Sequence, residues 1–260
     1  MKHPSITIVG AGRLGTALAK SLSEAGYPVK TLIRKSRRVP QPGAQVTWFC
    51  VPDAAIAHAA ETFSQFEWRG RYAFHSSGVL SSDALNPLRK AGARVASVHP
   101  LMTFVKGSEP ELSGVPFAIE GDGSAVRVAR SMVHDLGGQA VTIKKQYKVA
   151  YHAFATMICP LLVSLLAASE KAAALAGMSA AESRRRMMPI IGQTLRNYGK
   201  LGPSAAFSGP IVRGDVETMR AHLNVLAKIP VAKNAYAALA RTALDLLPNR
   251  NRRQVARLLD

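Results

Sequence analysis

The chain has 260 residues, of which 48% are hydrophobic, and its formal net charge is +18. Its length suits two domains, and its apolar content can fill two cores. Both halves are basic, with 18 basic and 10 acidic residues up to Lys145 and 16 and 6 beyond it, and no aromatic residues interleave with the basic clusters. This distribution argues against a nucleic-acid partner and favours a solvated basic surface.

Cysteine and histidine spacing gives no indication of a disulfide framework or a metal site. Cys50 and Cys159 stand in apolar stretches without CxxC spacing, so we expect a reducing compartment. The histidines lack ligand spacing, and we expect no metal. Residues 1–4 run directly into a strand pattern and show none of the features of a signal peptide. We therefore expect a cytoplasmic protein.

Short apolar runs alternate with helical patterns through the first 145 residues. Alternation of this kind predicts parallel strands with helices on both faces, which is a doubly wound α/β sheet in a first domain over residues 1–145. The predicted strands are Ser5–Val9, Val29–Ile33, Val46–Val51, Tyr72–His75, Arg94–Val98, Val115–Glu120 and Ala140–Ile143. The predicted helices are Leu14–Ala25, Ala54–Phe63, Ser82–Lys90 and Ala125–Leu136.

Helical patterns alone follow, which predicts an all-helical second domain over residues 146–260. A long apolar helix is expected to about Ala176, followed by helices over Ala180–Tyr198, Asp215–Leu226 and Ala232–Leu247. Within the first of these, Val149–Ala168 is apolar enough for a membrane span, but it contains His152 and Pro160 and has no aromatic belt. We therefore expect a buried helix and no membrane partner.

A glycine-rich turn follows the first predicted strand and opens the first predicted helix. It reads Gly10-Ala11-Gly12-Arg13-Leu14-Gly15. In a Rossmann dinucleotide-binding fold, the three glycines allow the tight turn, the close approach of the pyrophosphate and the packing of helix on sheet. The helix N-terminus adds free N–H groups for phosphate. The alternative is an ordinary strand-to-helix turn with incidental glycines.

The end of the second strand distinguishes the two nicotinamide cofactors. NAD sites place a carboxylate there for the ribose 2′-hydroxyl, whereas this chain reads Arg34-Lys35-Ser36-Arg37-Arg38. Arginine, lysine and serine can hold a 2′-phosphate through charge-assisted hydrogen bonds. We therefore predict NADP(H) as the cofactor, with a solvated basic loop as the alternative.

Further cofactor contacts are expected where the third and fourth strands end, since open parallel sheets bind ligands at that edge. The residues there are Val51, Pro52, Asp53, Ser76 and Ser77. Asp53 has an alternative role as the cap of the helix that begins at Ala54. The two serines have an alternative role as turn residues.

Five motifs resemble one family. They are His75-Ser76-Ser77-Gly78, His99-Pro100-Leu101-Met102-Thr103-Phe104, Lys148 with Tyr151-His152, the stretch from Ser208 to Asp215, and His222-Leu223. Together they resemble bacterial Rossmann proteins whose C-terminal half is called domain of unknown function 2520, relatives of pyrroline-carboxylate reductase and the β-hydroxyacid dehydrogenases. The resemblance implies an NADP-dependent oxidoreductase, dimeric through its helical domain, with no settled substrate. One departure is Ile158-Cys159-Pro160, where the family has alanine, serine and asparagine.

Lys148 and His152 are the catalytic candidates. Four residues apart on a helix, they share one face, and the β-hydroxyacid dehydrogenases have a lysine and an asparagine at this spacing. A positioned lysine or histidine can exchange the proton that accompanies hydride transfer to or from a small carbonyl, hydroxy acid or imine. The alternative is a surface lysine beside a structural histidine.

The substrate-binding candidates are Ser76, Ser77, His99, Arg213 and Asp215. His99 follows a strand end and either lines the cleft or orders the loop. Arg213 can clamp an anionic group, and Asp215 suits the cap of the helix that follows it. His222 is expected to be structural or interfacial. The predicted function is NADP(H)-dependent oxidoreduction of a small molecule, and the alternative is a non-catalytic NADP-binding protein.

Overall fold

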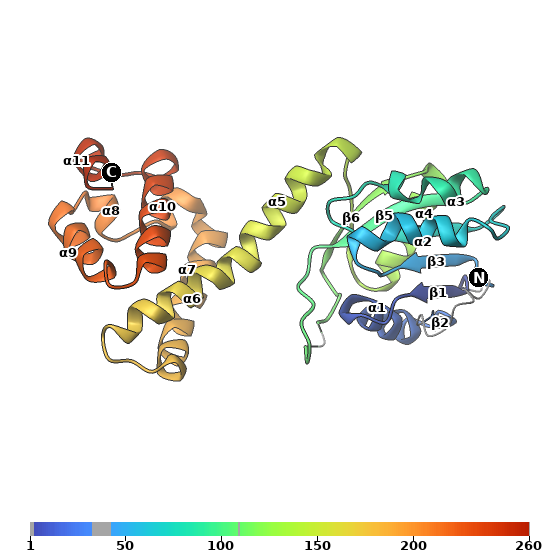
Figure 1. Ribbon diagram of the computed structural model, residues 1–260, viewed down its shortest axis with the longest axis horizontal. Coiled ribbons are helices and arrows are strands. Elements are labelled where there is room, and N and C mark those ends of the chain that lie inside the picture. The colour runs from blue at the N-terminus through green and yellow to red at the C-terminus, as the bar shows by residue number, and fades with distance from the viewer. Residues whose placement is uncertain (1–2, 33–42, 109, 260) are drawn as a thin grey trace. The chain divides into compact units, whose positions relative to one another are not determined.

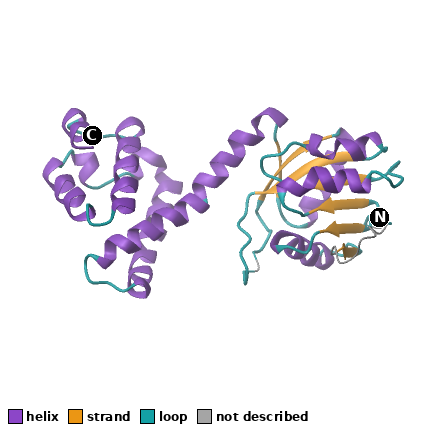
Figure 2. Cartoon of the chain, in the orientation of Figure 1, coloured by secondary structure: helices purple, strands orange, loops and turns teal. Residues whose placement is uncertain are grey.

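The computed structural model describes residues 3–32, 43–108 and 110–259 and divides the chain into two compact units. The first unit, Met1–Met157, contains every described strand, and the second, Ile158–Asp260, is built of helices (Figure 2). The predicted α/β class with an all-helical C-terminal part is confirmed. The sheet unit continues beyond Lys145, the predicted boundary, because it includes the helix α5 (Lys148–Ile158) almost to its end.

Seven strands form one sheet in the order β2-β1-β3-β4-β5-β6-β7. They are β1 (Ile6–Val9), β2 (Val29–Leu32), β3 (Val46–Phe49), β4 (Tyr72–His75), β5 (Arg94–Pro100), β6 (Pro116–Gly121) and β7 (Gln139–Thr142). All neighbours pair in parallel except β5 and β6, which are antiparallel. The prediction of parallel pairing throughout is wrong at this point. No described residue between β5 and β6 forms a crossover helix, so the chain returns beside β5 in the opposite direction.

Helices cover both faces of this sheet (Figure 1). Residues of α1 (Arg13–Glu24) and α4 (Gly123–Asp135) share one buried cluster with Trp48, whereas residues of α2 (Asp53–Phe63) and α3 (Asn86–Lys90) share another with Phe49. Adjacent strand residues point to opposite faces, so each strand contributes to both clusters. This doubly wound arrangement places the carboxyl ends of β1, β3, β4 and β5 along one edge.

The second unit has its own apolar core, formed by residues such as Met219, Leu223, Leu244 and Val255. Its helices are α6 (Pro160–Ala174), α7 (Ala180–Ala206), α8 (Pro210–Arg213), α9 (Val216–Leu226), α10 (Pro230–Leu246) and α11 (Arg252–Leu259). The short helices α8 and α11 were not predicted. The predicted helix over Ala180–Tyr198 continues as α7, which Gly202 interrupts with a φ of 75°.

The apolar stretch Val149–Ala168 differs from its prediction in two ways. It is two helices, because Pro160 cannot continue α5 and instead begins α6. It is also not buried, since Val149 is 64% and Val163 62% exposed, so the prediction of a buried helix is wrong. By length and composition alone, Lys145–Ala174 could cross a membrane. Pro160 divides this stretch into helices of 11 and 15 residues.

Candidate active site

The glycine turn joins β1 to α1 as the sequence predicts. Gly10 has a φ of 109°, and a Cβ there would lie 2.6 Å from the Cys50 carbonyl oxygen. A Cβ on Gly15 would overlap the carbonyl oxygen of Gly10. In contrast, a Cβ on Gly12, the N-cap residue of α1, would meet no atom within 4 Å. Two glycines are therefore required by close packing, and the third leaves open space at a helix N-terminus, as a phosphate cradle requires.

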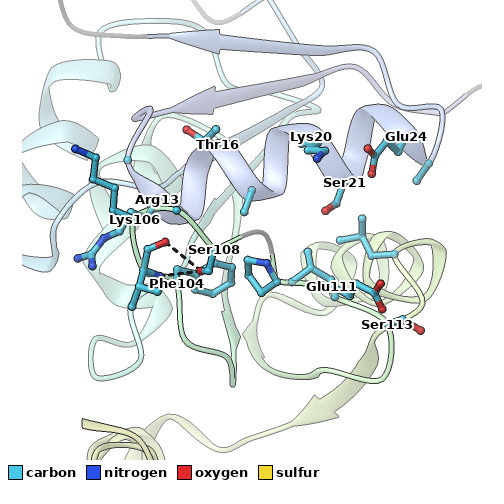
Figure 3. A pocket seen from close by; sticks show the side chains of 18 of the residues that line it. Arg13, Thr16, Lys20, Ser21, Glu24, Phe104, Lys106, Ser108, Glu111 and Ser113 are labelled. Carbon is cyan, nitrogen blue, oxygen red and sulfur yellow. Dashed lines mark hydrogen bonds between the residues drawn. The ribbon is translucent and has the colours of Figure 1, made fainter. Parts of the chain in front are cut away.

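A cavity of about 920 Å³ opens beside this turn (Figure 3). One wall is α1, and another is the loop that contains Phe104, Lys106 and Glu111. Arg13 and Lys106 lie at the end near the turn, whereas Glu24 and Glu111 lie toward the other end (Figure 3). The positive end of the cavity is therefore the end that suits an anionic ligand.

The structure describes some of the predicted cofactor contacts, whereas others lie outside the described residues. The run Arg34, Lys35, Ser36, Arg37 and Arg38 lies outside the described residues. Leu14 is the second residue of α1, and Val51 and Pro52 join β3 to α2. Pro52 is the N-cap of α2, and the helix begins at Asp53. The alternative role of Asp53 as the cap of a helix beginning at Ala54 is therefore wrong.

The Asp53 carboxylate instead orders the loop after β4. It accepts a hydrogen bond of 2.8 Å from the Ser77 hydroxyl, and the same hydroxyl accepts from the backbone N–H of Leu80 at 2.9 Å. The Ser76 hydroxyl accepts from Trp48 Nε1 at 2.8 Å. Both serine side chains thus hold the loop in shape.

His75 is a neutral, fully buried residue beneath that loop. Its Nδ1 accepts from the Ser77 backbone N–H at 3.1 Å, so its Nε2 carries the proton and donates to the Ser81 carbonyl at 3.0 Å. Burial lowers the pKa of His75 to about 4. A single tautomer is therefore fixed by the fold, and His75 acts as part of the frame.

Lys148 is the most unusual residue of the site, because its side chain is only 1% exposed. Its Nζ donates to the Ser77 carbonyl at 2.9 Å and to the Ser97 hydroxyl at 2.7 Å. Burial lowers the pKa of Lys148 to about 8, although attraction by the carboxylates of Glu120 and Asp53 opposes this shift. The alternative of a surface lysine is wrong.

Glu120 completes this buried cluster from β6. It stands opposite Ser97 in the antiparallel register and accepts from both the backbone N–H and the hydroxyl of Ser82, at 2.6 and 2.9 Å. It is 4% exposed. Ser97, which bonds Lys148, and Glu120, which attracts its charge, thus both come from strands that the sequence predicts, although neither was singled out.

His99 and His152 meet over Gly78. A Cβ on Gly78 would overlap the ring of His152 and lie 2.8 Å from His99 Nε2. The two imidazole centroids are 6.1 Å apart, and the Tyr151 ring packs edge-on to His99 at 5.9 Å. Burial and the Lys148 charge lower the pKa of His99 to about 4, and its buried Nδ1 has no hydrogen-bond partner among the described residues. His99 therefore lines the site as a neutral imidazole.

Arg213 and Asp215 belong to the second unit, so the structure does not place them relative to these residues. Asp215 caps α9 by accepting from the Thr218 backbone N–H at 3.2 Å, as its sequence position predicts. The Arg213 guanidinium lies 3.9 Å from the Asp215 carboxylate. His222 contacts the Tyr236 hydroxyl at 3.2 Å, which fits its expected structural role. The roles of Arg213 and Asp215 in substrate binding stay predictions.

Comparison with known families agrees with these motifs. Residues 115–243 match the family model described as "Domain of unknown function (DUF2520)". The chain contains a DUF2520 domain. The matched region begins at β6, so the DUF2520 domain takes in the last two strands of the sheet as well as most of the helical unit. None of the curated proteins compared with the chain matches it.

Solved structures share the fold over nearly the whole chain. The "putative NADP oxidoreductase BF3122" from Bacteroides fragilis is 20% identical, with a TM-score of 0.78 over 93% of this chain and 98% of that one. Protein TM1727 from Thermotoga maritima is 21% identical, with a TM-score of 0.69 over 97% and 98%. An imine reductase from Aspergillus terreus, solved with NADPH4 and dibenz[c,e]azepine, is 14% identical, with a TM-score of 0.61 over 99% and 100%. At these identities the likeness shows the Rossmann-like fold and no more.

Sequence reasoning missed Gly78, Ser82, Ser97 and Glu120 as parts of the site. A usable signal exists for Ser97, because residues two apart on a strand share a face, and His99 was already a candidate. Glu120 depends on the antiparallel pairing of β6, which the sequence pattern did not predict. Gly78 was quoted within a motif, and only the positions of the two imidazoles reveal why it lacks a side chain.

Proposed function

We propose that the chain is an NADP(H)-dependent oxidoreductase that transfers hydride to or from a small carbonyl, hydroxy acid or imine. One observation carries this proposal: the glycine turn and the cluster of Lys148, His99 and His152 lie at the carboxyl edge of a single doubly wound sheet. Ligands of such sheets bind at this edge, across the point where the strand order reverses. That point lies between β1 and β3.

The first reason to assign a dinucleotide is the fit of the turn. Space over Gly12, free N–H groups at the start of α1 and the positive end of the cavity at Arg13 and Lys106 would hold the diphosphate. The basic run from Arg34 to Arg38 would hold the 2′-phosphate, because it follows β2 and contains no carboxylate. Fold relatives named as imine reductases or reductive aminases include structures solved with NADPH, which supports the same choice.

The second reason is the chemistry available beyond β4 and β5. The cofactor, when bound, would supply or accept the hydride. Lys148 and His152 lie one helical turn apart and offer the proton that must accompany hydride transfer. The His99 and His152 rings, which cover Gly78 in the loop after β4, would form one wall of the substrate site.

One observation favours a second candidate function, which is non-catalytic NADP binding. The Lys148 ammonium is almost fully buried and already bonded, so it is less available than a surface lysine for proton exchange. A panel of keto acids, hydroxy acids and cyclic imines, followed by NADPH absorbance, separates the two functions. The proposed enzyme turns over at least one class, and a Lys148→Ala variant retains NADPH binding but turns the substrate over more slowly. Binding of NADPH without turnover on any class would support the second function.

We also propose that two copies of the chain associate through the apolar helices. Large apolar side chains of α6 and α7 are widely exposed, including Val163 at 62%, Met188 at 58% and Ile190 at 67%. The two helices pack against each other, and large apolar side chains exposed on neighbouring helices indicate an interface. A second copy fits best, because closed dimers are the commonest assembly and bury the same face on both partners.

A further inference from the structure

Lys148 and His152 have different surroundings, which indicate different roles. Lys148 Nζ is tied to two groups at the carboxyl ends of neighbouring strands, the carbonyl of Ser77 after β4 and the hydroxyl of Ser97 in β5. Both are themselves buried. These bonds fasten the first turn of α5 to the sheet and leave the ammonium enclosed.

His152 occupies a different position one turn further along α5. Its ring lies directly on Gly78, in the loop that follows β4, and faces the His99 ring. It is half-buried, so part of the ring reaches solvent, whereas Lys148 is enclosed. The room that Gly78 leaves by having no side chain is the room that this imidazole fills. Of Lys148 and His152, His152 is thus the one that meets the ligand edge of the sheet without being enclosed.

We propose that His152 is the catalytic proton donor and that Lys148 is a positioning residue, which holds α5 against β4 and β5 so that the His152 imidazole rests on Gly78. This assignment rests on the proposed reductase function. It differs from the expectation, implied by the β-hydroxyacid dehydrogenases, that the lysine itself exchanges the proton with substrate.

The proton balance of imine reduction provides a direct test. Hydride adds to the carbon of the C=N bond, and the π electron pair moves to nitrogen. A new N–H bond then forms with the proton that leaves the His152 imidazolium, and the neutral imidazole regains a proton from water. An N-methyl cyclic iminium ion accepts hydride in the same way but needs no proton, because its nitrogen simply takes up the electron pair. Only a neutral imine therefore depends on the proton donor.

The experiment compares a neutral cyclic imine with its N-methyl iminium analogue in His152→Ala, Lys148→Met and the double variant. We expect His152→Ala to lower kcat on the imine about a hundredfold or more, the usual effect of losing a general acid. The rate on the iminium ion should change less than about threefold. Lys148→Met should lower kcat on the imine less than His152→Ala does and add nothing in the His152→Ala background, because it acts through His152. His58→Ala and Lys90→Met, both exposed on the sheet unit, serve as matched controls.

The opposite pattern would overturn the assignment: an imine-specific loss in Lys148→Met, with His152→Ala fully active. A wild-type protein that reduces neither substrate would instead refute the imine class of the proposed function. The position of the two residues is then tested separately by chemical modification. Diethyl pyrocarbonate should modify His152, NADPH should protect it, and Lys148 should resist reductive methylation in the folded protein. Methylation of Lys148 that NADPH blocks, with His152 unaffected, would contradict the proposal without any reference to turnover.

Discussion

The Nζ atom of Lys148 donates a hydrogen bond of 2.7 Å to the hydroxyl of Ser97, and this bond joins α5 to β5 across a buried surface. The two residues are 51 positions apart in the chain. Their contact makes the first turn of α5 part of the sheet unit and fixes the direction in which the helix leaves it. The positions of Tyr151 and His152 follow from that direction.

Buried neutral histidines predict a loss of stability in acid. The pKa of His75 is lowered from 6.5 to about 4 by burial, so between these values the unfolded chain binds more protons than the folded one. The stabilising contribution is therefore complete above about pH 6.5 and is lost as the pH falls toward 4. For His75 the loss between pH 7.5 and 5 is about 2 kcal/mol.

Urea unfolding of the wild type and of His75→Gln at these two pH values measures the contribution of His75 to the free energy of unfolding. The variant is expected to lose less stability on acidification than the wild type, whatever its stability at pH 7.5. His58→Gln, on the exposed face of α2, should behave as the wild type does. An unchanged pH dependence in His75→Gln would show that His75 is not the group responsible.

Alanine substitutions at two glycines of the turn should both weaken cofactor binding but should differ in their effect on stability. Gly12→Ala meets no atom within 4 Å and requires no unusual backbone angle, so stability should stay within about 0.5 kcal/mol of the wild type. The added methyl group would nevertheless occupy the space of the diphosphate, and the Kd for NADPH and NADH should both rise about tenfold or more.

Gly15→Ala places a methyl group on the Gly10 carbonyl oxygen, so α1 must move away from the strand end. We expect a loss of about 3 kcal/mol in unfolding free energy together with loss of cofactor binding. Calorimetric titration and denaturant unfolding of both variants give the comparison. Unimpaired binding in Gly12→Ala would argue against a diphosphate at this turn.

Gly78→Ala should impair the site more than the fold. The substitution requires no left-handed backbone, so its cost is the displacement of the His152 and His99 rings, about 1–3 kcal/mol for an overpacked position. Turnover should fall more than tenfold because the imidazoles leave their places. Gly43→Ala, which meets no atom within 4 Å, is the matched control. Full activity in a correctly folded Gly78→Ala protein would show that the two rings need not rest on this residue.

The exposed apolar helices predict a dimer that single charges can weaken. Val163→Asp and Ile190→Asp introduce a carboxylate into the face formed by α6 and α7, where it would be buried without a partner. Light scattering after size-exclusion chromatography should find a dimer for the wild type and a shift toward monomer for these variants. Leu246→Asp, 74% exposed at the end of α10, should leave the mass unchanged. A wild-type protein that is monomeric at micromolar concentrations would contradict the proposed interface.

The sheet and the glycine turn were predictable because local patterns encode them. Each strand of the sheet unit appears as a short apolar run, and the turn combines strand, glycine spacing and helix start in one segment. The direction of β6 was not predictable in this way, since it depends on a connection without a crossover helix. The exposure of Val149 and Val163 was also missed, because an apolar helix buried in its own chain and one that meets a partner have the same composition.

The site itself was predicted in part. Lys148, His152 and His99 were found from spacing and strand ends, but the depth of Lys148 was not, because burial of an ammonium depends on residues far away in the chain. Ser97 and Glu120 provide that environment, and each is an ordinary strand residue when seen in sequence alone.

The central claim is that the chain binds NADP(H) at the edge of the sheet unit with the run from Arg34 to Arg38 selecting the 2′-phosphate. It is tested most directly by the ratio of the Kd for NADH to the Kd for NADPH, measured by calorimetric titration for the wild type and for Arg34→Glu. We predict a wild-type ratio of at least about ten, since a charge-assisted contact contributes about 1.5–3 kcal/mol, and a ratio near or below one in Arg34→Glu. Equal affinity of the wild-type protein for both nucleotides would contradict the assignment.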